Sequence, residues 1–306
     1  MIPAEDGFYP DISESAYFAD RGSLSVSGAK LLLPPSCPAK FREAQDNPPP
    51  PRAVFDFGTL AHALILGKGP ELEILDPAVH GLKADGTVAD VPAMTGMWKK
   101  AAAAARAAGK LPVSTDDHNA ASAMRDAVMA HPVAGPLFTD GQPEVSAYRT
   151  DPETGVRLRG RFDWLRDDGM IVDLKTSVTA NPAELQRRFW QYGYYMQAAM
   201  YTWLLTGKTN EPDPDFVFVT VEKTAPYVVT VVRYDAEAID EGRRMNRRAI
   251  DLYAACMETG VWPGYTDGIE TISLPGWALP KPETLGDYLA DQYIYETDPL
   301  LEEHSA

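Results

Sequence analysis

The stretch from Arg157 to Lys175 limits what this chain can fold into more than any other part of the sequence. Residues typical of β-strands fill its two halves, VRLRGRFDWL and MIVDLKTS, and the turn-forming residues Asp-Asp-Gly at 167–169 lie between them. Two such runs around a short turn predict a β-hairpin.

The second strand of this hairpin places an acid and a base on one surface. Because side chains alternate along a strand, Asp173 and Lys175 point to one face and Leu174 to the other. Asp163 precedes Asp173 by ten residues, so an antiparallel hairpin brings the two carboxylates together. Neighbouring carboxylates repel unless a cation lies between them. The pattern predicts a site for a hard divalent cation, Mg²⁺ or Mn²⁺, that also contacts substrate phosphate.

Motifs on both sides of the hairpin resemble those of the PD-(D/E)XK nuclease superfamily. The resemblance extends from about residue 23 to residue 218, and it is most specific for the phage RecE-like (exonuclease VIII-type) exonucleases of the RecB/RecE branch. The opening LSVSGAKLLLPPSCPAKFRE is also similar to the start of those proteins. The residues that carry the resemblance are His62 in FDFGTLAHALIL, Asp163, Asp173-Leu174-Lys175, and Gln197 and Tyr201 in QAAMY.

The resemblance implies an α/β fold with a PD-(D/E)XK nuclease-like core, in which helices flank a mixed central β-sheet. It also implies a Mg²⁺-dependent exodeoxyribonuclease that degrades linear duplex DNA 5′ to 3′ without ATP, in recombination of the phage type. Two alternatives stay open. One is a structure-specific endonuclease on the same core, and the other is an inactive DNA-end-binding accessory protein.

The same resemblance assigns roles to individual residues. Asp163, Asp173 and the backbone carbonyl of Leu174 hold the metal, and Lys175 activates the attacking water. His62 ligates the metal or contacts phosphate, while Gln197 and Tyr201 position the substrate. Further candidates are Glu144 as a third carboxylate and Ser27, Arg159 and Arg161 as phosphate contacts.

Each of these further candidates has a structural alternative. Ser27 fits equally well as a plain helix N-cap. Glu144 is also explained as a charge that protects a sheet edge. The arginines at 157 and 159 would pair with nearby acids instead of phosphates, and the aromatic stripe around Tyr201 would serve core packing.

Composition sets further limits on function. The two cysteines, Cys37 and Cys256, are too few for the four-cysteine iron–sulfur cluster of some relatives, and their spacing suggests neither a disulfide framework nor a zinc site. A net charge of −16 argues against DNA binding by simple attraction. Much of the acid lies after residue 280, however, while residues 157–188 carry a small basic excess that is compatible with a DNA channel.

The expected organisation is a polar N-terminal segment (1–22) lying loosely on the surface, one nuclease domain (23–265) and an acidic tail (266–306). Within the domain we expect a helical insertion at about 70–132, with 71–91 rich in loops, and a polyproline spacer at 47–52. Residues 190–205 are predicted to form one helix with Gln197 and Tyr201 on one face, and FDFGTLAHALILG to form another that stops at Gly67. MWKKAAAAARAAGK is predicted to be a helix with a solvated basic face made by Lys99, Lys100, Arg106 and Lys110. Without a signal peptide or an apolar span, we expect a cytoplasmic protein, in the host if phage-encoded. The resemblance implies DNA ends, a single-strand annealing recombinase and a ring-shaped homo-oligomer as partners.

Overall fold

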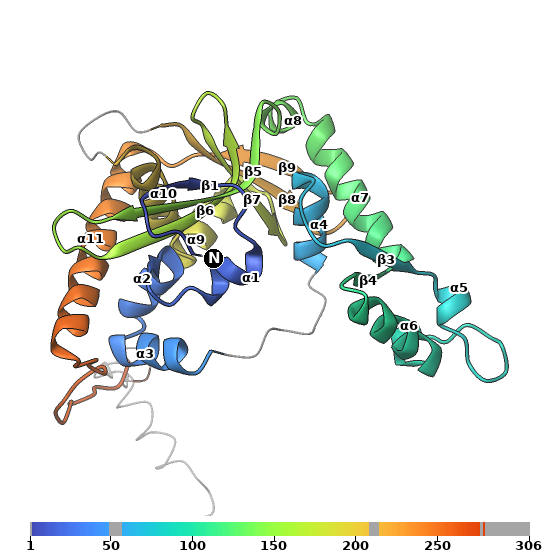
Figure 1. The fold of residues 1–306 in the computed structure, drawn as a ribbon, viewed down its shortest axis with the longest axis horizontal. Coiled ribbons are helices and arrows are strands. Elements are labelled where there is room, and N and C mark those ends of the chain that lie inside the picture. The colour runs from blue at the N-terminus through green and yellow to red at the C-terminus, as the bar shows by residue number, and fades with distance from the viewer. Residues whose placement is uncertain (1, 49–56, 208–213, 276–277, 279–306) are drawn as a thin grey trace, which may run out of the picture. The chain divides into compact units, whose positions relative to one another are not determined.

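The structure is a computed structural model that describes residues 2–48, 57–207, 214–275 and 278. The chain divides into two compact units, residues 1–265 and 266–306. All that follows concerns the first unit, whose elements are labelled in Figure 1. The part of the polyproline stretch from residue 49 onward lies outside the described residues.

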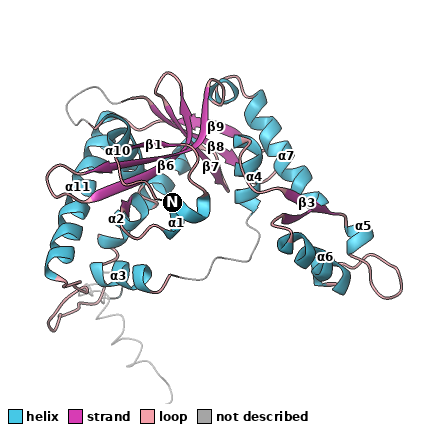
Figure 2. Cartoon of the chain, viewed as in Figure 1, coloured by secondary structure: helices cyan, strands magenta, loops and turns pink. Residues whose placement is uncertain are grey.

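A mixed sheet forms the centre of the first unit (Figure 2). It has seven strands in the order β1-β5-β6-β7-β8-β9, with β2 paired to β6 beside this path. Two pairs, β7 with β8 and β2 with β6, are parallel, and the others are antiparallel. The α/β class with a mixed sheet flanked by helices is therefore confirmed. The strands are β1 (Gly7–Tyr9), β2 (Leu24–Ser25), β5 (Gly141–Thr150), β6 (Arg157–Arg166), β7 (Ile171–Ser177), β8 (Phe216–Glu222) and β9 (Val229–Val232).

Helices cover both faces of the sheet, and each face has its own apolar core. In β7, Ile171 belongs to one core, while Val172 and Leu174 belong to the other, as period-2 alternation predicts. Asp173 and Lys175 therefore face the same layer as Ile171. That layer contains α2 (Val26–Leu32), α9 (Pro182–Gln191), α10 (Tyr194–Thr206) and α11 (Ala236–Thr259), and the opposite one contains α4 (Phe57–Leu66), α7 (Thr115–Ala130) and α8 (Ala134–Leu137).

The predicted hairpin is present as β6 and β7, with Gly169 at φ +88° in its turn. Such a φ strains residues with a side chain, so the turn requires the glycine that the sequence supplies. Among the helices, α4 ends before Gly67, as expected from the sequence. The remaining elements are α1 (Glu14–Ala19), α3 (Pro38–Asp46), β3 (Leu72–Leu75), α5 (Pro77–His80), a 3₁₀ turn (Pro92–Met94), α6 (Gly96–Ala107) and β4 (Leu111–Ser114).

The expectation of a loose N-terminal segment at 1–22 is wrong. This segment supplies edge strand β1 and helix α1, and the arginines of β6 hold it in place. Arg157 donates hydrogen bonds to the carbonyls of Pro3 and Glu5, at 2.9 and 2.6 Å. Arg161 donates to the carbonyl of Ile12 at 2.8 Å. Polar composition alone predicted a loose segment. The contacts that order it use backbone carbonyls, which every sequence has, so composition does not reveal them.

One other local expectation is wrong, and one holds only in part. Residues 71–91 were expected to be rich in loops, which is true of 81–91, but β3 pairs in parallel with β4 and α5 follows it. Residues 190–205 do not form one helix, because α9 ends at Gln191 and α10 begins at Tyr194. Gly193 between them has φ +63°, a left-handed conformation that interrupts a helix. The helical pattern on both sides concealed this break.

Candidate active site

Strand β6 shares one of its edges between two partners, and the site lies where they separate. Its first half pairs with β2 at Leu158 and Arg159. Its second half pairs with β7, where the register joins Trp164 to Val172. Beyond that pair, the backbone amide of Leu174 donates to Oδ2 of Asp163 at 2.8 Å. The carboxylate of Asp163 therefore reaches the Asp173-Leu174-Lys175 segment across a fork in the sheet.

Asp173 is buried at this fork, with 1% of its side chain exposed. Nε2 of Gln197 on α10 donates to its Oδ1 at 2.5 Å. Nζ of Lys175 lies 2.5 Å from its Oδ2 and forms an ion pair with it.

Helix α4, which packs on the opposite face of the sheet, brings His62 to the fork. Leu60, Ala61 and Ile65 are buried in the core, which turns His62 toward Asp163. Nε2 of His62 lies 3.0 Å from Oδ2 of Asp163. Both His62 and Lys175 thus lie beside a carboxylate at the same site, as the sequence pattern suggested.

Tyr201 lies one helical turn after Gln197 on α10 and lines the same cleft. Its ring packs edge-to-face on Phe162, with ring centroids 5.3 Å apart. This close approach requires Gly160, since a Cβ there would lie 2.8 Å from the Tyr201 ring. Burial raises the pKa of the Tyr201 hydroxyl.

Glu144 also lines the cleft, from β5. Its neighbours Pro143 and Val145 pair with Trp164 and Phe162, so Glu144 stands across from Asp163. The backbone of Glu144 has φ +52°, which is uncommon for a residue with a side chain and often marks a functional position. Glu144 therefore stays a candidate third carboxylate.

The three candidate phosphate contacts line the cleft, but they differ in how free they are. Ser25, not Ser27, is the N-cap of α2, which leaves Ser27 exposed. Arg159 is buried, and its Nη1 lies 3.0 Å from Oδ2 of Asp20. Arg161 donates from Nε to Oγ of Ser146 at 3.1 Å. Both guanidinium groups bind protein acceptors. The alternative given for Arg159, pairing with a nearby acid, is confirmed, whereas Arg157 binds backbone carbonyls instead.

Charges and burial shift the pKa values of the central groups in opposite directions. Burial raises the pKa of Asp173 to about 6, with nearby Asp163 adding to the rise and Lys175 opposing it. Burial also pushes the pKa of Asp163 upward, but His62, Lys175 and the Leu174 amide outweigh it and hold the value below its ordinary range. One carboxylate is thus ionised well below neutral pH, and the other titrates close to it.

The positively charged groups respond to the same carboxylates. Burial lowers the pKa of Lys175, but Asp173 and Asp163 overcome this effect and raise it. Burial likewise opposes the charged form of His62, while Asp163 raises its pKa overall. The site therefore holds a protonated Lys175 at neutral pH.

The donor set fits a hard cation that has few protein ligands. Among the residues that the structure describes, no three His, Cys, Asp or Glu side chains gather as a complete metal centre. Mg²⁺ needs no such cage, since it retains several waters and binds through one or two carboxylates plus substrate phosphate. The available donors are the carboxylates of Asp163 and Asp173 and the Leu174 carbonyl.

Sequence reasoning missed one wall of the cleft. Helix α1 contributes Glu14, Tyr17 and Phe18 to the lining of a cleft of about 590 Å³. The guanidinium of Arg161 lies 4.5 Å from the Tyr17 ring centroid. A possible signal was the row of arginines on β6, because buried cations require acceptors from some other segment of the chain.

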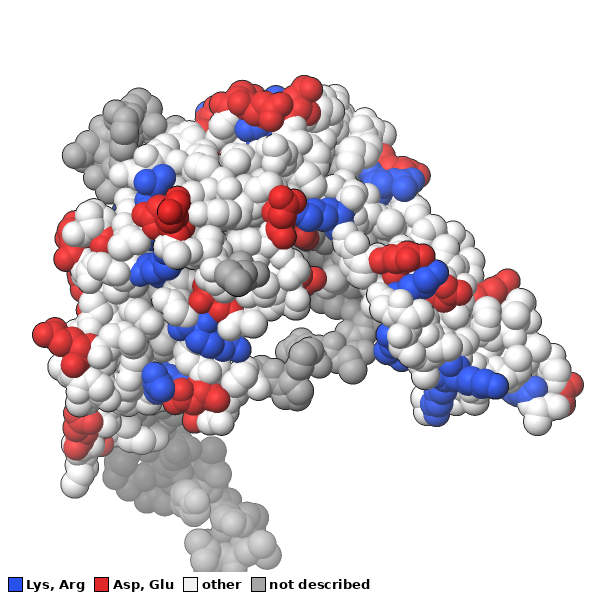
Figure 3. Space-filling view, in the orientation of Figure 1, with Lys and Arg blue, Asp and Glu red and all other residues white. Residues whose placement is uncertain are grey.

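Surface charge on the first unit is mixed, and basic side chains gather over α6 on the face shown in Figure 3. Lys99, Lys100 and Arg106 of this helix are exposed, as its sequence predicts. Lys110, which follows the helix, instead pairs with Glu71 at 2.7 Å. In the cleft, by comparison, basic residues lie next to acidic ones, while the chain as a whole is acidic.

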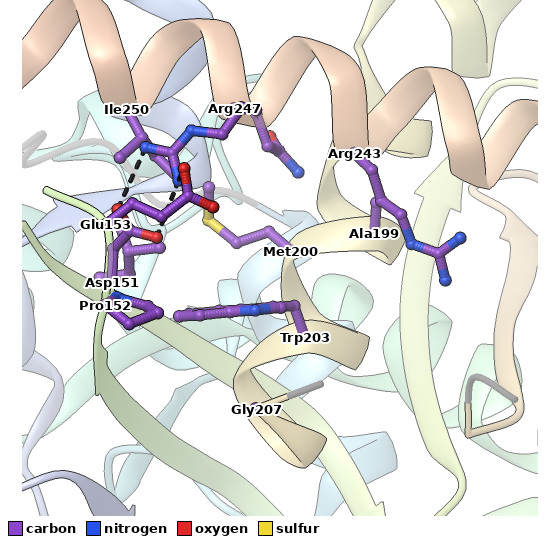
Figure 4. Close-up of a pocket in the computed structure, with 12 residues that line it drawn as sticks. Asp151, Pro152, Glu153, Ala199, Met200, Trp203, Gly207, Arg243, Arg247 and Ile250 are labelled. Atoms are coloured by element: carbon purple, nitrogen blue, oxygen red, sulfur yellow. Dashed lines mark hydrogen bonds and ion pairs between the residues drawn. The ribbon is translucent and has the colours of Figure 1, made fainter. Parts of the chain in front are cut away.

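A separate hollow lies on the other side of α10 (Figure 4). It is lined by Trp203, Met200 and the ion pair between Arg247 and Asp151, whose Nη1 and Oδ1 lie 2.9 Å apart. No residue of the fork lines it. One helix thus turns Gln197 and Tyr201 toward the acids and Met200 and Trp203 away from them.

Comparison with known proteins agrees with this fold. Residues 25–275 match the family described as PDDEXK-like domain of unknown function (DUF3799), and the chain belongs to that family. Its domain is therefore of the PD-(D/E)XK nuclease type. No curated protein matches the chain. A crystal structure from Eubacterium rectale described as a "putative exonuclease" is similar, with a TM-score of 0.54 and 14% identity over 87% of this chain and 96% of that one. At this identity the likeness shows the fold alone.

No helix among the described residues is both long enough and apolar enough to cross a membrane.

Proposed function

We propose that this protein is a Mg²⁺-dependent exodeoxyribonuclease that degrades linear double-stranded DNA from its ends. The observation that carries the proposal is the meeting of five side chains from three parts of the chain at the β6/β7 fork. Contacts of 2.5 to 3.0 Å join them into one network. The five are Asp163, Asp173, Lys175, Gln197 and His62.

Each of these residues has a role that its surroundings support. Asp163, Asp173 and the Leu174 carbonyl would hold Mg²⁺ or Mn²⁺, which lowers the pKa of a bound water and neutralises phosphate charge. The ammonium group of Lys175 lies beside Asp173, where it orients the water and stabilises the charge that develops on the phosphate. Gln197 fixes the rotamer of Asp173 through its hydrogen bond.

His62 and Tyr201 complete the proposed site. His62 is bonded to Asp163 and borders the cleft, so it orients this carboxylate and can contact a phosphate oxygen. Tyr201 lies at the cleft wall, which suits a substrate-positioning role. Glu144 and Ser27 also border the cleft and are proposed as a further carboxylate and a phosphate contact.

The finer parts of the proposal come from the resemblance to RecE-like exonucleases. They are 5′ to 3′ polarity, independence from ATP, a ring-shaped oligomer, and a single-strand annealing partner in phage-type recombination in the host cytoplasm. Arg159 and Arg161 as phosphate contacts belong to the same set. Their internal bonds at 3.0 and 3.1 Å mean that DNA would have to share or replace protein acceptors.

Digestion of linear and circular DNA tests the proposal. We expect release of acid-soluble nucleotides from linear duplex in Mg²⁺, none in EDTA, and none from a covalently closed circle of the same sequence. Cutting of the circle would show the endonuclease alternative. If neither form releases nucleotides above the background of Lys175→Ala, the nuclease proposal is wrong and the DNA-end-binding alternative is left.

A further inference from the structure

Lys175 lies at the junction of two hollows. One is the cleft described above, and the other, of about 200 Å³, continues past the end of β7. Lys175, Thr176 and Tyr194 line both. The second hollow is also lined by Arg188 from α9 and by Lys223, which follows β8. Whatever binds in it therefore lies directly next to the proposed reaction centre.

Cations line this second hollow without ion pairs of their own. Within the described part of the chain, neither Arg188 nor Lys223 has an ion pair or a side-chain hydrogen bond, and both are partly exposed. They differ in this from Arg159 and Arg161, whose guanidinium groups bind protein acceptors. Arg188 and Lys223 are available to an anion from solution.

An aromatic stack leads outward from the catalytic ammonium group. Nζ of Lys175 lies 4.6 Å from the ring centroid of Tyr194. Tyr194 stacks on Tyr192, with centroids 5.5 Å apart and planes at 29°. The Tyr192 residue is 56% exposed, and Nζ of Lys30 holds its carbonyl at 2.8 Å. The stack thus ends in a ring that is more than half exposed to solvent.

We propose that this second hollow binds single-stranded DNA beside the scissile phosphate, with a base stacked on Tyr192 and phosphates bound by Arg188 and Lys223. The inference rests on the proposed function and extends it by naming a strand-binding surface. Exposed aromatic rings combined with cations are typical of single-strand binding, because an interior base can stack on such a ring only after it has left its duplex. Inside a duplex, neighbouring pairs cover the base faces, and only a terminal pair has one face free.

Binding of a short fluorescein-labelled oligothymidine, measured by anisotropy in EDTA, tests the inference without hydrolysis. We expect Arg188→Gln/Lys223→Gln to weaken binding by about 10-fold or more. The slope of log affinity against log salt should fall by about 1.4, since each phosphate contact on a single strand contributes about 0.7. Tyr192→Ala should weaken binding by about 10-fold with no change in that slope, and Tyr192→Phe should retain affinity.

The matched control is Arg106→Gln/Arg248→Gln, which removes the same charge from two exposed positions outside both hollows. We expect its binding to equal that of the native protein. If it weakens binding as much as Arg188→Gln/Lys223→Gln, or if the latter has no effect, the surface is not a strand-binding site.

Nuclease assays on the same variants separate this inference from the function on which it rests. Mg²⁺-dependent hydrolysis with unchanged oligonucleotide binding in Arg188→Gln/Lys223→Gln would remove the surface and leave the nuclease. Binding that maps to Arg188, Lys223 and Tyr192 in a protein that hydrolyses no DNA would remove the nuclease and leave the surface.

Discussion

The two halves of β6 carry polar side chains on the same face but use them in different ways. In the first half, Arg157, Arg159 and Arg161 bind acceptors of the N-terminal segment, although Arg159 and Arg161 also border the cleft. In the second half, Asp163 borders an open cleft and meets His62 and the Leu174 amide. What covers a polar residue, and not its type or its parity on the strand, decides whether it supports the fold or faces substrate.

Replacing an acid of the fork should have the largest effect. We expect Asp173→Asn to reduce the rate of DNA hydrolysis by roughly 1000-fold, because a metal ligand contributes several kcal/mol to stabilising the transition state. Initial rates on linear duplex in Mg²⁺ measure it, with cooperative thermal unfolding as the control for folding. A variant that retains more than a tenth of the rate would contradict a metal role for Asp173.

Breaking the ion pair between Asp20 and Arg159, in the first half of β6, should reduce the stability of the fold. Asp20→Ala leaves the guanidinium of Arg159 buried without its carboxylate, so the free energy of unfolding should fall by about 3–5 kcal/mol. Urea denaturation measures the change. Asp20→Leu/Arg159→Met, which removes both charges, should recover much of it.

Two results would contradict the comparison. The first is an unchanged free energy of unfolding in Asp20→Ala. The second is a loss of DNA affinity, measured on folded protein, that is as large in free energy as the loss of stability. The second result would mean that Arg159 serves DNA as well as the N-terminal segment.

Removal of a supporting hydrogen bond should have a smaller effect than removal of a ligand. Gln197→Ala frees the rotamer of Asp173 and should weaken cation affinity by about 10- to 100-fold. Calorimetric titration with Mn²⁺ measures it, and Gln197→Glu tests whether the position requires a donor. Unchanged Mn²⁺ affinity in Gln197→Ala would show that Asp173 is positioned by Lys175 and packing alone.

Lowering the pH should weaken cation binding at the fork gradually. Because burial raises the pKa of Asp173 to about 6, a proton competes with the cation below that pH. Cation affinity should be constant above about pH 7 and fall up to 10-fold per pH unit below about pH 6. Titrations at several pH values measure this, and constant affinity down to pH 5 would contradict the assignment of Asp173 as a ligand.

The sequence predicted the elements whose signal is local. Alternation and a turn sequence were enough for β6, β7 and the common face of Asp173 and Lys175. Helical spacing was enough for α4 and for the shared face of Gln197 and Tyr201. The prediction that Asp163 and Asp173 lie close together agrees with the hydrogen bond from Leu174 to Asp163.

Features that depend on distant partners could not be predicted. The two-residue strand β2 exists because β6 has a free edge near Arg159, and nothing in Leu24-Ser25 itself indicates this. The N-terminal segment is ordered by carbonyl groups that every sequence possesses. The second hollow beside Lys175 is lined by Tyr192 and Tyr194, which lie on the two sides of the break at Gly193.

The most direct test of the fork as a catalytic site is Mg²⁺-dependent nucleotide release from linear duplex DNA by the native protein and by Lys175→Ala, with Lys110→Ala as a remote control. The fork account predicts release by the native protein and by Lys110→Ala, and a rate at background for Lys175→Ala with unfolding still cooperative. Equal release by all three proteins, at a rate well above background, would contradict it.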